Sequence, residues 1–158
     1  MQALYIFRMK IIIKSAQIID LHSPFHGKTQ SFLIENGIIT SIADEISETA
    51  DLIFEYPNLK ISAGWLDMRV SAKDPGMEYQ EDLISVQKAA AAGGFTEIAV
   101  LPNTHPTIQN KESIIYQQNK ANFSPVKVHP IAAVTIDTHG IDLTEMIDLH
   151  HAGAVAFS

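Results

Sequence analysis

The sequence predicts an α/β fold in two parts, because the pattern of apolar residues changes near residue 61. Residues 1–61 contain short apolar strands separated by turns, as in part of a small β-sandwich. Residues 62–158 alternate apolar strands with helical segments, which is typical of a parallel sheet with right-handed crossovers. We therefore expect two domains, residues 1–61 and 62–158.

The first part contains short strands and one tight hairpin. Asn36-Gly37 separates the last two strands, and this pair is favoured in two-residue hairpin turns because both central positions take a positive φ. The strands are expected at residues 11–13, 16–20, 31–34 and 38–42.

In the second part, strands and helices follow one another in turn. Gly93-Gly94 comes directly after the first predicted helix, as is typical of a helix C-terminus. The helices are expected at residues 81–92, 110–119 and 143–152. The strands are expected at residues 61–70, 96–101, 126–134 and 154–157.

Composition excludes several classes of function. The chain has 158 residues, of which 46% are hydrophobic and 18% charged. Typical domains carry about 25% charged residues. We therefore expect much buried surface, within the chain or against a partner. A net charge of −7 argues against nucleic acid and anionic membranes as partners. Without cysteine there is no disulfide, no thiolate zinc site and no cysteine nucleophile.

No feature of the sequence indicates a membrane or secreted protein. No apolar run reaches the roughly 18 residues that span a bilayer. Residues 1–8 are apolar but lack a basic region and a cleavage site, and Met9 is an alternative start. We therefore expect a cytoplasmic protein, with either Met1 or Met9 as its first residue.

The most informative segment is Asp67–Gly76, at the end of the strand predicted at residues 61–70. Its outline is Asp-x-His-x-His-x-Arg-(Asp/Glu)-Pro-Gly, a metallohydrolase signature. Two histidines spaced two apart on a strand point to the same side, so both imidazoles reach one metal ion. In this chain the histidine positions hold Arg69 and Ser71, and the arginine position holds Lys73.

Further motifs occur in the order that one enzyme family shows. From Lys10 onward the chain resembles bacterial dihydroorotases of the multifunctional-complex type, in the amidohydrolase superfamily. The motifs that carry the resemblance are Ser62–Asp67, Asp74-Pro75-Gly76 with Glu78 and Glu81-Asp82, Ala89–Thr96, Leu101–Pro106 and Gly153–Ser158.

The resemblance implies a (β/α)8 TIM barrel with a small β-sandwich built from both ends of the chain. Residues 62–158 would supply the first three and a half β/α units of this barrel. A closed barrel needs roughly 250 residues, so we expect a fragment of a longer protein, with association of half-barrels as the alternative.

The resemblance also implies a reaction. In the family, zinc activates a water molecule that opens the cyclic amide of dihydroorotate, or closes carbamoyl aspartate in the biosynthetic direction. Zinc lowers the pKa of its bound water toward about 7 and polarises the amide carbonyl. Arg69 has no lone pair with which to bind a metal, and facing a dication at about 4 Å it would cost on the order of 8 kcal/mol. The hydroxyl of Ser71 is a poor zinc ligand compared with imidazole.

We therefore expect degenerate metal positions at Arg69 and Ser71, with no catalytic residue and no metal ligand in this segment. By resemblance, Lys73 and Asn103 are candidate ligands of a substrate carboxylate, although lysine lacks the planar two-point grip of arginine. The interpretations without function are a surface or ion-paired arginine, a filler serine, a solvated lysine and an asparagine that shapes its turn. Asp137 and His139 are a conceivable metal-ligand pair, and His129 has no evident partner.

Three hypotheses remain open at this point. The first is a catalytically inactive dihydroorotase-like protein of pyrimidine biosynthesis with a structural or assembly role and no cofactor. By analogy with family members that lack ligands, its partner would be aspartate carbamoyltransferase, and a homo-oligomer is expected. The second is an active cyclic amidohydrolase with altered zinc ligation. The third is a fragment without activity of its own.

Overall fold

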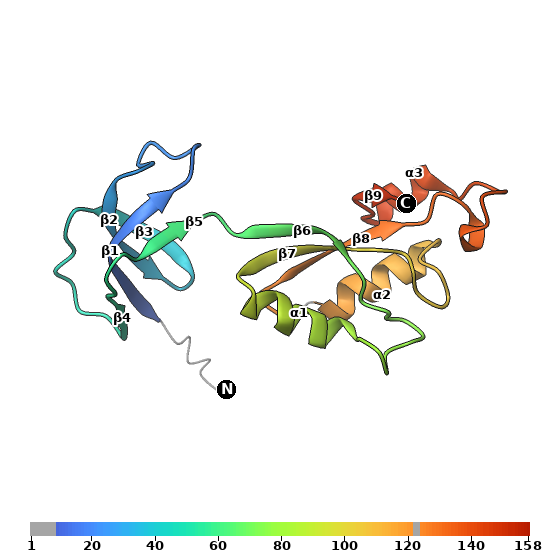
Figure 1. Cartoon of the computed structure of the whole chain (residues 1–158), viewed down its shortest axis with the longest axis horizontal. Helices are drawn as coiled ribbons and strands as arrows, with labels where there is room; N and C mark the ends of the chain where they lie inside the picture. The colour runs from blue at the N-terminus through green and yellow to red at the C-terminus, as the bar shows by residue number, and fades with distance from the viewer. Residues whose placement is uncertain (1–8, 122–123) are drawn as a thin grey trace, which may run out of the picture. The chain divides into compact units, whose positions relative to one another are not determined.

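The computed structural model describes residues 9–121 and 124–158 (Figure 1). The chain divides into two compact units, Met1–Ala63 and Gly64–Ser158. The sequence features noted for residues 1–8 lie outside the described residues. Within the described ranges, no helix is both long enough and apolar enough to cross a membrane.

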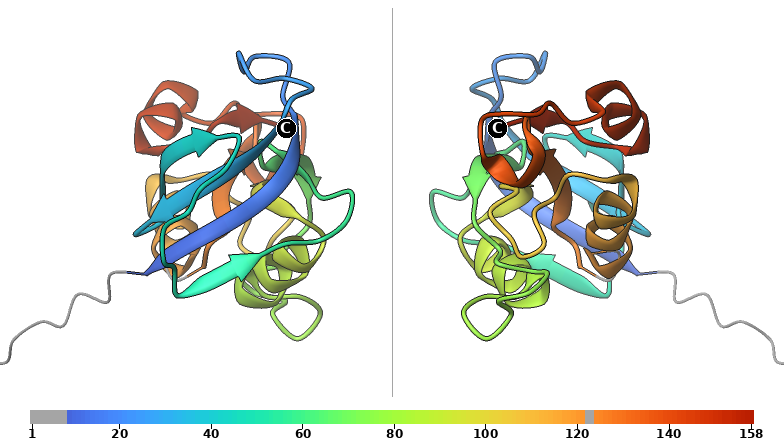
Figure 2. Two further views of the ribbon diagram at one scale, coloured as in Figure 1. Left: turned by 90° about the vertical axis from the view of Figure 1, so that its left-hand side faces the viewer. Right: turned by 90° about the vertical axis from the view of Figure 1, so that its right-hand side faces the viewer.

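The N-terminal unit contains a five-stranded mixed sheet in the order β3-β2-β1-β4, with β5 also paired to β1. Its strands are β1 (Lys10–Ile19), β2 (Thr29–Glu35), β3 (Ile38–Ala43), β4 (Leu52–Phe54) and β5 (Lys60–Ser62). β4 pairs with the first half of β1 and β5 with the second half, both in parallel. Figure 2 (left) shows β1 as the long blue strand between β2 and β4.

One prediction in this unit is corrected and another is confirmed. Two strands were expected at residues 11–13 and 16–20, but β1 is one strand whose register shifts between Ile13 and Ala16. Ser15 has a φ of 51° there, so a bulge absorbs the extra residue without ending the strand. The hairpin at Asn36-Gly37 is confirmed, with φ values of 54° and 80° between paired β2 and β3. β4 was not predicted, because its exposed residues show no alternation.

The C-terminal unit is a four-stranded parallel sheet in the sequential order β6-β7-β8-β9. Its strands are β6 (Trp65–Val70), β7 (Phe95–Val100), β8 (Lys127–Ala132) and β9 (Ala156–Phe157). The helices that connect them are α1 (Leu83–Ala92), α2 (Lys111–Ala121) and α3 (Met146–Ala152). The predicted alternation of strand and helix is confirmed.

The single strand expected at residues 61–70 is wrong. β5 ends at Ser62 in the N-terminal sheet, and β6 begins at Trp65 in the C-terminal sheet. Gly64 stands at the break, where a Cβ would lie 1.9 Å from Thr96 Oγ1. The apolar run is continuous in sequence, but its two halves pair with different partners.

The helices occur where they were expected, with shifted ends. α1 begins after Asp82, whose side chain accepts a hydrogen bond of 2.6 Å from the Ser85 N–H, and this cap fixes the first turn. Gly94 follows the helix with a φ of 86°, as its sequence predicted. The third helix begins at Met146 rather than Leu143, because Leu143 forms a β-bridge with Thr135.

Helices α1 and α2 pack against one face of the parallel sheet (Figure 1). The cluster between them contains Leu83 of α1, Ala121 of α2 and the strand residues Ile98, Val100 and Val128. A second cluster joins α3 to the end of β8. This packing fixes the ends of the strands, so the loops that leave β6, β7 and β8 meet at the carboxyl edge of the sheet, where barrel enzymes place their active sites.

Candidate functional site

A pocket of about 630 Å³ lies at the carboxyl edge of the parallel sheet. Met68 and Arg69 come from the end of β6, and Asn103 from the loop after β7. The other lining residues belong to the loops after β7 and β8 and to the end of β9, and they are Leu101, Pro102, Thr104, Thr107, Ile131, Val134, Thr135, Thr138, Gly140 and Ser158.

Arg69 lines this pocket from the first of the two degenerate metal positions. Its backbone N–H donates to Asp67 Oδ1 at 2.9 Å, so Asp67 shapes the strand end. Arg69 is exposed and forms no ion pair with a carboxylate within the described ranges. The pocket therefore contains a guanidinium without a counter-ion from the described residues.

Ser71 and Asn103 are brought together. The Asn103 amide Nδ2 donates to Ser71 Oγ at 3.0 Å, and the Ser71 hydroxyl lies 3.2 Å from Asn103 Oδ1. This contact links the loop after β6 to the loop after β7. Ser71 therefore holds Asn103 in place at the pocket.

Lys73 is not brought into this group. It has a φ of 57°, and its carbonyl oxygen accepts a hydrogen bond of 2.9 Å from the Met77 N–H. Its side chain is not among the residues that line the pocket. Of the four predicted site residues, Arg69 and Asn103 line the pocket and Ser71 supports Asn103.

The residues at this edge do not fit zinc. The end of β6 presents a guanidinium and a hydroxyl where zinc needs imidazole, thiolate or carboxylate donors. Over residues 9–121 and 124–158, no three His, Cys, Asp or Glu side chains gather closely enough to hold a metal ion. Asp137 is held by Gln109, whose Nε2 donates to Asp137 Oδ1 at 2.9 Å.

Asp74 forms a buried hydrogen-bond network that sequence analysis missed. Its side chain is 0% exposed. Oδ1 accepts from the Tyr116 hydroxyl at 2.8 Å. Oδ2 accepts from the Leu83 N–H at 3.1 Å and forms an ion pair of 2.8 Å with Lys120 Nζ. One carboxylate thus ties the loop after β6 to α1 and α2. The Asp-Pro-Gly motif identified the position but not its partners.

This network raises the pKa of Lys120. Burial by itself lowers the pKa of Lys120, but its hydrogen bonds to Asp74 and Tyr116 outweigh that effect and raise the pKa above its usual value. The lysine therefore stays charged at neutral pH, as a buried carboxylate requires of its partner.

The loops after β6 and β7 also touch through their backbones. Gly76 has a φ of 98°, and a Cβ on it would lie 1.5 Å from the His105 carbonyl oxygen. The His105 N–H donates to the Pro75 carbonyl at 3.0 Å. Only glycine permits this approach, which explains the glycine of the Asp-Pro-Gly motif.

The sequence analysis found no partner for His129, and the structure supplies one. His129 Nε2 on β8 pairs with Glu97 Oε2 on the neighbouring strand β7. The register sets Ala99 opposite His129, so Glu97 lies two residues earlier on the same face of its strand. Only strand pairing reveals this contact.

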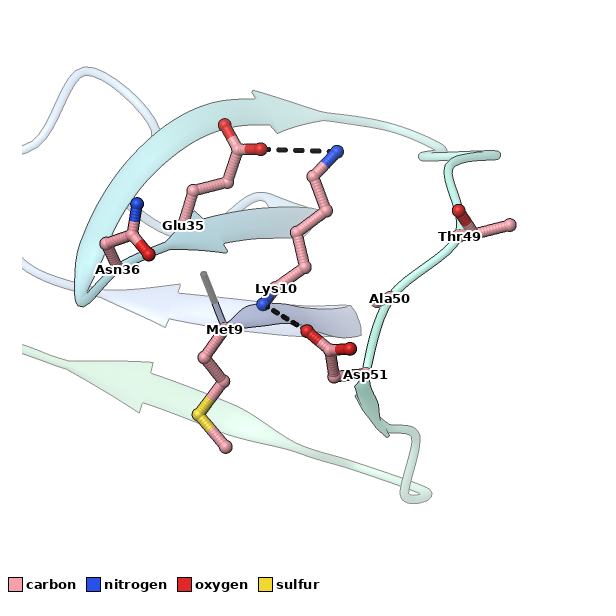
Figure 3. A pocket seen from close by; sticks show the side chains of 7 residues that line it. All are labelled: Met9, Lys10, Glu35, Asn36, Thr49, Ala50 and Asp51. Atoms are coloured by element: carbon pink, nitrogen blue, oxygen red, sulfur yellow. Dashed lines mark hydrogen bonds and ion pairs between the residues drawn. The ribbon is translucent and has the colours of Figure 1, made fainter. Parts of the chain in front are cut away.

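A second pocket, of about 620 Å³, lies in the N-terminal unit (Figure 3). The positively charged side chain in this pocket is Lys10, whose Nζ forms ion pairs with Glu35 at 3.2 Å and with Glu48. Hydrogen bonds to Glu48 and Glu35 raise the pKa of Lys10. The Lys10 N–H donates to Asp51 Oδ2 at 2.7 Å. This charge is already neutralised, so we take the pocket of Arg69 as the candidate site.

The chain is similar to curated dihydroorotases. It is 40% identical over 152 residues to the dihydroorotase of Geotalea daltonii and 38% identical over 158 residues to that of Trichlorobacter lovleyi. Each match covers 95% of this chain and 36% of the relative. The chain therefore spans about a third of the length of these curated relatives.

Solved structures show the fold. An L-hydantoinase (dihydropyrimidinase) from Arthrobacter aurescens matches with a TM-score of 0.73 and 19% identity, over 94% of this chain and 32% of that one. A dihydroorotase matches with a TM-score of 0.67 and 10% identity, over 95% of this chain and 42% of that one. The predicted fold class, the N-terminal part of a (β/α)8 TIM barrel preceded by strands of a small β-sandwich, is confirmed.

The model of the dihydro-orotase-like family matches residues 58–158, a range that contains the whole parallel sheet and the pocket of Arg69. This chain belongs to the dihydro-orotase-like family.

Proposed function

We propose that this chain is a dihydroorotase-like protein of pyrimidine biosynthesis that does not catalyse metal-dependent ring opening and serves a structural or assembly role. One observation carries the proposal. At the end of β6, Arg69 and Ser71 occupy the positions of the family's two metal-binding histidines.

The chemistry of these side chains supports the loss of catalysis. A guanidinium stays protonated and offers no lone pair, and it repels a dication in the same pocket. Ser71 is engaged with Asn103 and has no neighbouring base that would make it a nucleophile among its hydrogen-bond partners.

The surrounding structure supports a role that needs the fold. Asp74 keeps its partners on α1 and α2, and Gly76 keeps the close approach to His105. These residues hold the loops of the site in place although the ligand positions have changed. A protein retained for assembly needs this packing but not the metal.

The proposed partner is aspartate carbamoyltransferase, within a complex that also contains more than one copy of this chain. The support for this partner is the analogy with family members that lack metal ligands.

The first test is the zinc content of the purified protein, measured by elemental mass spectrometry, together with turnover of dihydroorotate. We expect a folded protein with far less than one zinc per chain and no turnover. The dihydroorotase of Geotalea daltonii, purified in the same way, is the control. Stoichiometric zinc with turnover would establish the alternative, an active cyclic amidohydrolase with altered metal ligation.

The second test concerns assembly. The chain is mixed with aspartate carbamoyltransferase from the same source, and the mass of the product is measured by size-exclusion chromatography with light scattering. We expect a complex heavier than either protein alone. Two separate peaks at micromolar concentration would contradict the assembly role.

A further inference from the structure

We infer that the loop between β8 and α3, residues 133–145, is a two-state element beside the pocket, and that Gln109 holds it in the state that the structure shows. In this held state the loop forms part of the pocket lining. In the other state its tip is released from the segment that precedes α2. The inference goes beyond the proposed function, because it concerns how the pocket changes shape and is independent of zinc and of assembly.

The loop joins β8 to α3 (Figure 1), and its two ends are bonded to each other. The Thr144 N–H donates to the Val134 carbonyl at 3.0 Å. The Ile136 N–H donates to the Asp142 carbonyl at 2.8 Å. Because the ends are closed in this way, the tip between them, residues 137–141, is able to move as one unit.

The tip contains two consecutive residues with a left-handed backbone. Asp137 has a φ of 51° and a ψ of 17°, and Thr138 has a φ of 62°. Aspartate tolerates this region, but a β-branched residue such as threonine is an outlier there. Such conformations persist only where the surrounding contacts hold them, and they are typical of clamps and switch regions. Release of the tip therefore relieves strain at Thr138.

Gln109 supplies the contact that holds the tip. Its Nε2 donates to Asp137 Oδ1 at 2.9 Å, and its Oε1 accepts from the Asp137 N–H at 2.5 Å. The preceding residue, Ile108, is 0% exposed, and its carbonyl accepts from the Ala133 N–H at 2.8 Å. Gln109 thus extends from a fixed position. Both of its bonds to Asp137 are exposed, so water competes for the same groups and the net stabilisation is modest.

The two states differ in the shape of the pocket. Thr135, Thr138 and Gly140 line the pocket from this loop, and Thr107 lines it from the segment after β7. Release of the tip shifts Thr138 and Gly140 and so changes the lining. An occupant that contacts these residues only in the held state would favour that state, because a ligand shifts such an equilibrium by its difference in affinity for the two states.

The test is hydrogen–deuterium exchange of the full chain, followed by mass spectrometry at several labelling times. The amides of residues 136–140 are all hydrogen-bonded in the held state, so their exchange reports release of the tip. We expect Gln109→Ala to speed this exchange roughly tenfold, the effect of losing two exposed hydrogen bonds. Exchange in β7 and α1 should stay within about twofold of the wild type, since these elements open separately.

Two further variants separate the contact from the strain. Asp137→Asn keeps the side-chain oxygen that accepts from Gln109, so the exchange of the tip should remain close to that of the wild type. Thr138→Asn introduces a residue that adopts a positive φ more readily. Added to Gln109→Ala, it should slow the exchange of the tip.

Gln80→Ala is the matched control. It removes an exposed glutamine whose Nε2 donates to the Tyr79 hydroxyl at 2.9 Å, within the loop after β6. The same side-chain amide is lost, but away from the β8–α3 loop, so the exchange of residues 136–140 should not change.

Three results would overturn the inference. Unchanged exchange of residues 136–140 in Gln109→Ala would show that Gln109 does not hold the loop. Equal acceleration in β7 and α1 would show that the variant loosens the whole sheet and not one element. Exchange that Thr138→Asn fails to slow would show that strain does not favour release. None of these measurements involves zinc or a partner protein, so they fail or succeed separately from the proposed function.

Discussion

Arg69 lies at the end of β6 and Asp74 in the loop that follows it, but the two charged side chains have opposite surroundings. Asp74 is 0% exposed, and both of its carboxylate oxygens are hydrogen-bonded or ion-paired, to partners on α1 and α2. Arg69 is exposed and forms no ion pair within the described part of the chain.

The difference shows which half of a motif serves the fold and which half serves chemistry. Removal of a fully satisfied buried carboxylate leaves its partners without compensation, so Asp74 is needed for stability. An exposed side chain that lines a pocket carries much less of this constraint. Four predictions sharpen this contrast.

The largest effect is expected from Asp74→Ala, which leaves Lys120 and the Leu83 N–H without their acceptor. We expect a loss of about 3 kcal/mol in the free energy of unfolding, measured by urea denaturation. Asp148→Ala is the matched control: Asp148 forms an ion pair of 2.9 Å with Lys111, but on the surface. An equal loss in both variants would show that burial does not distinguish the two pairs.

The second prediction concerns a variant in which both altered metal-ligand positions at the end of β6 are changed to histidine. The double variant Arg69→His/Ser71→His places two imidazoles two residues apart, so both reach one metal ion. We expect at least tenfold more bound zinc per chain than in the wild type, measured by elemental mass spectrometry after gel filtration. The single variant Arg69→His is the control and should bind far less. No gain of zinc in the double variant would mean that these two positions are not what excludes the metal.

A smaller effect is expected from Tyr116→Phe, which removes one of the donors to Asp74. Because Tyr116 is 38% exposed and water compensates in part, we expect a loss of about 1 kcal/mol in the free energy of unfolding. Tyr79→Phe serves as the control, since Tyr79 is 83% exposed and its change should lie within experimental error. Equal urea midpoints for Tyr116→Phe and the wild type would remove Tyr116 from the network.

The smallest effect concerns pH and the cap of α1. The hydrogen bond from the Ser85 backbone lowers the pKa of Asp82 below its ordinary value of 3.8. A lowered pKa means that the stabilisation is present above this ordinary value and is lost as the pH falls through the lowered one. Asp82→Asn does not titrate, so its urea midpoint should be lower than that of the wild type at neutral pH and should approach it as the pH falls below the ordinary pKa of 3.8. A difference that is constant with pH would contradict the charged cap.

Local patterns in the sequence were enough for much of the fold. Asn36-Gly37 specified its hairpin because both central positions of the turn take a positive φ, which asparagine and glycine adopt readily. The alternation of apolar strands and helices specified the parallel sheet, and Gly93-Gly94 marked the end of α1. The ordered motifs around Asp67–Gly76 specified the family. Each of these signals is visible along the chain, without knowledge of which distant segments pack together.

The sequence by itself therefore determined the family, the class of fold and the replacement of two metal ligands by Arg69 and Ser71. The tertiary structure alone decided where the run at residues 61–70 breaks, which groups satisfy Asp74, and that Arg69 and Asn103 line one pocket. Tyr116 lies 42 residues from Asp74 along the chain. The physical reason is that periodicity and turn chemistry report local constraints, whereas the partners of a buried charge are set by contacts between elements that only folding brings together.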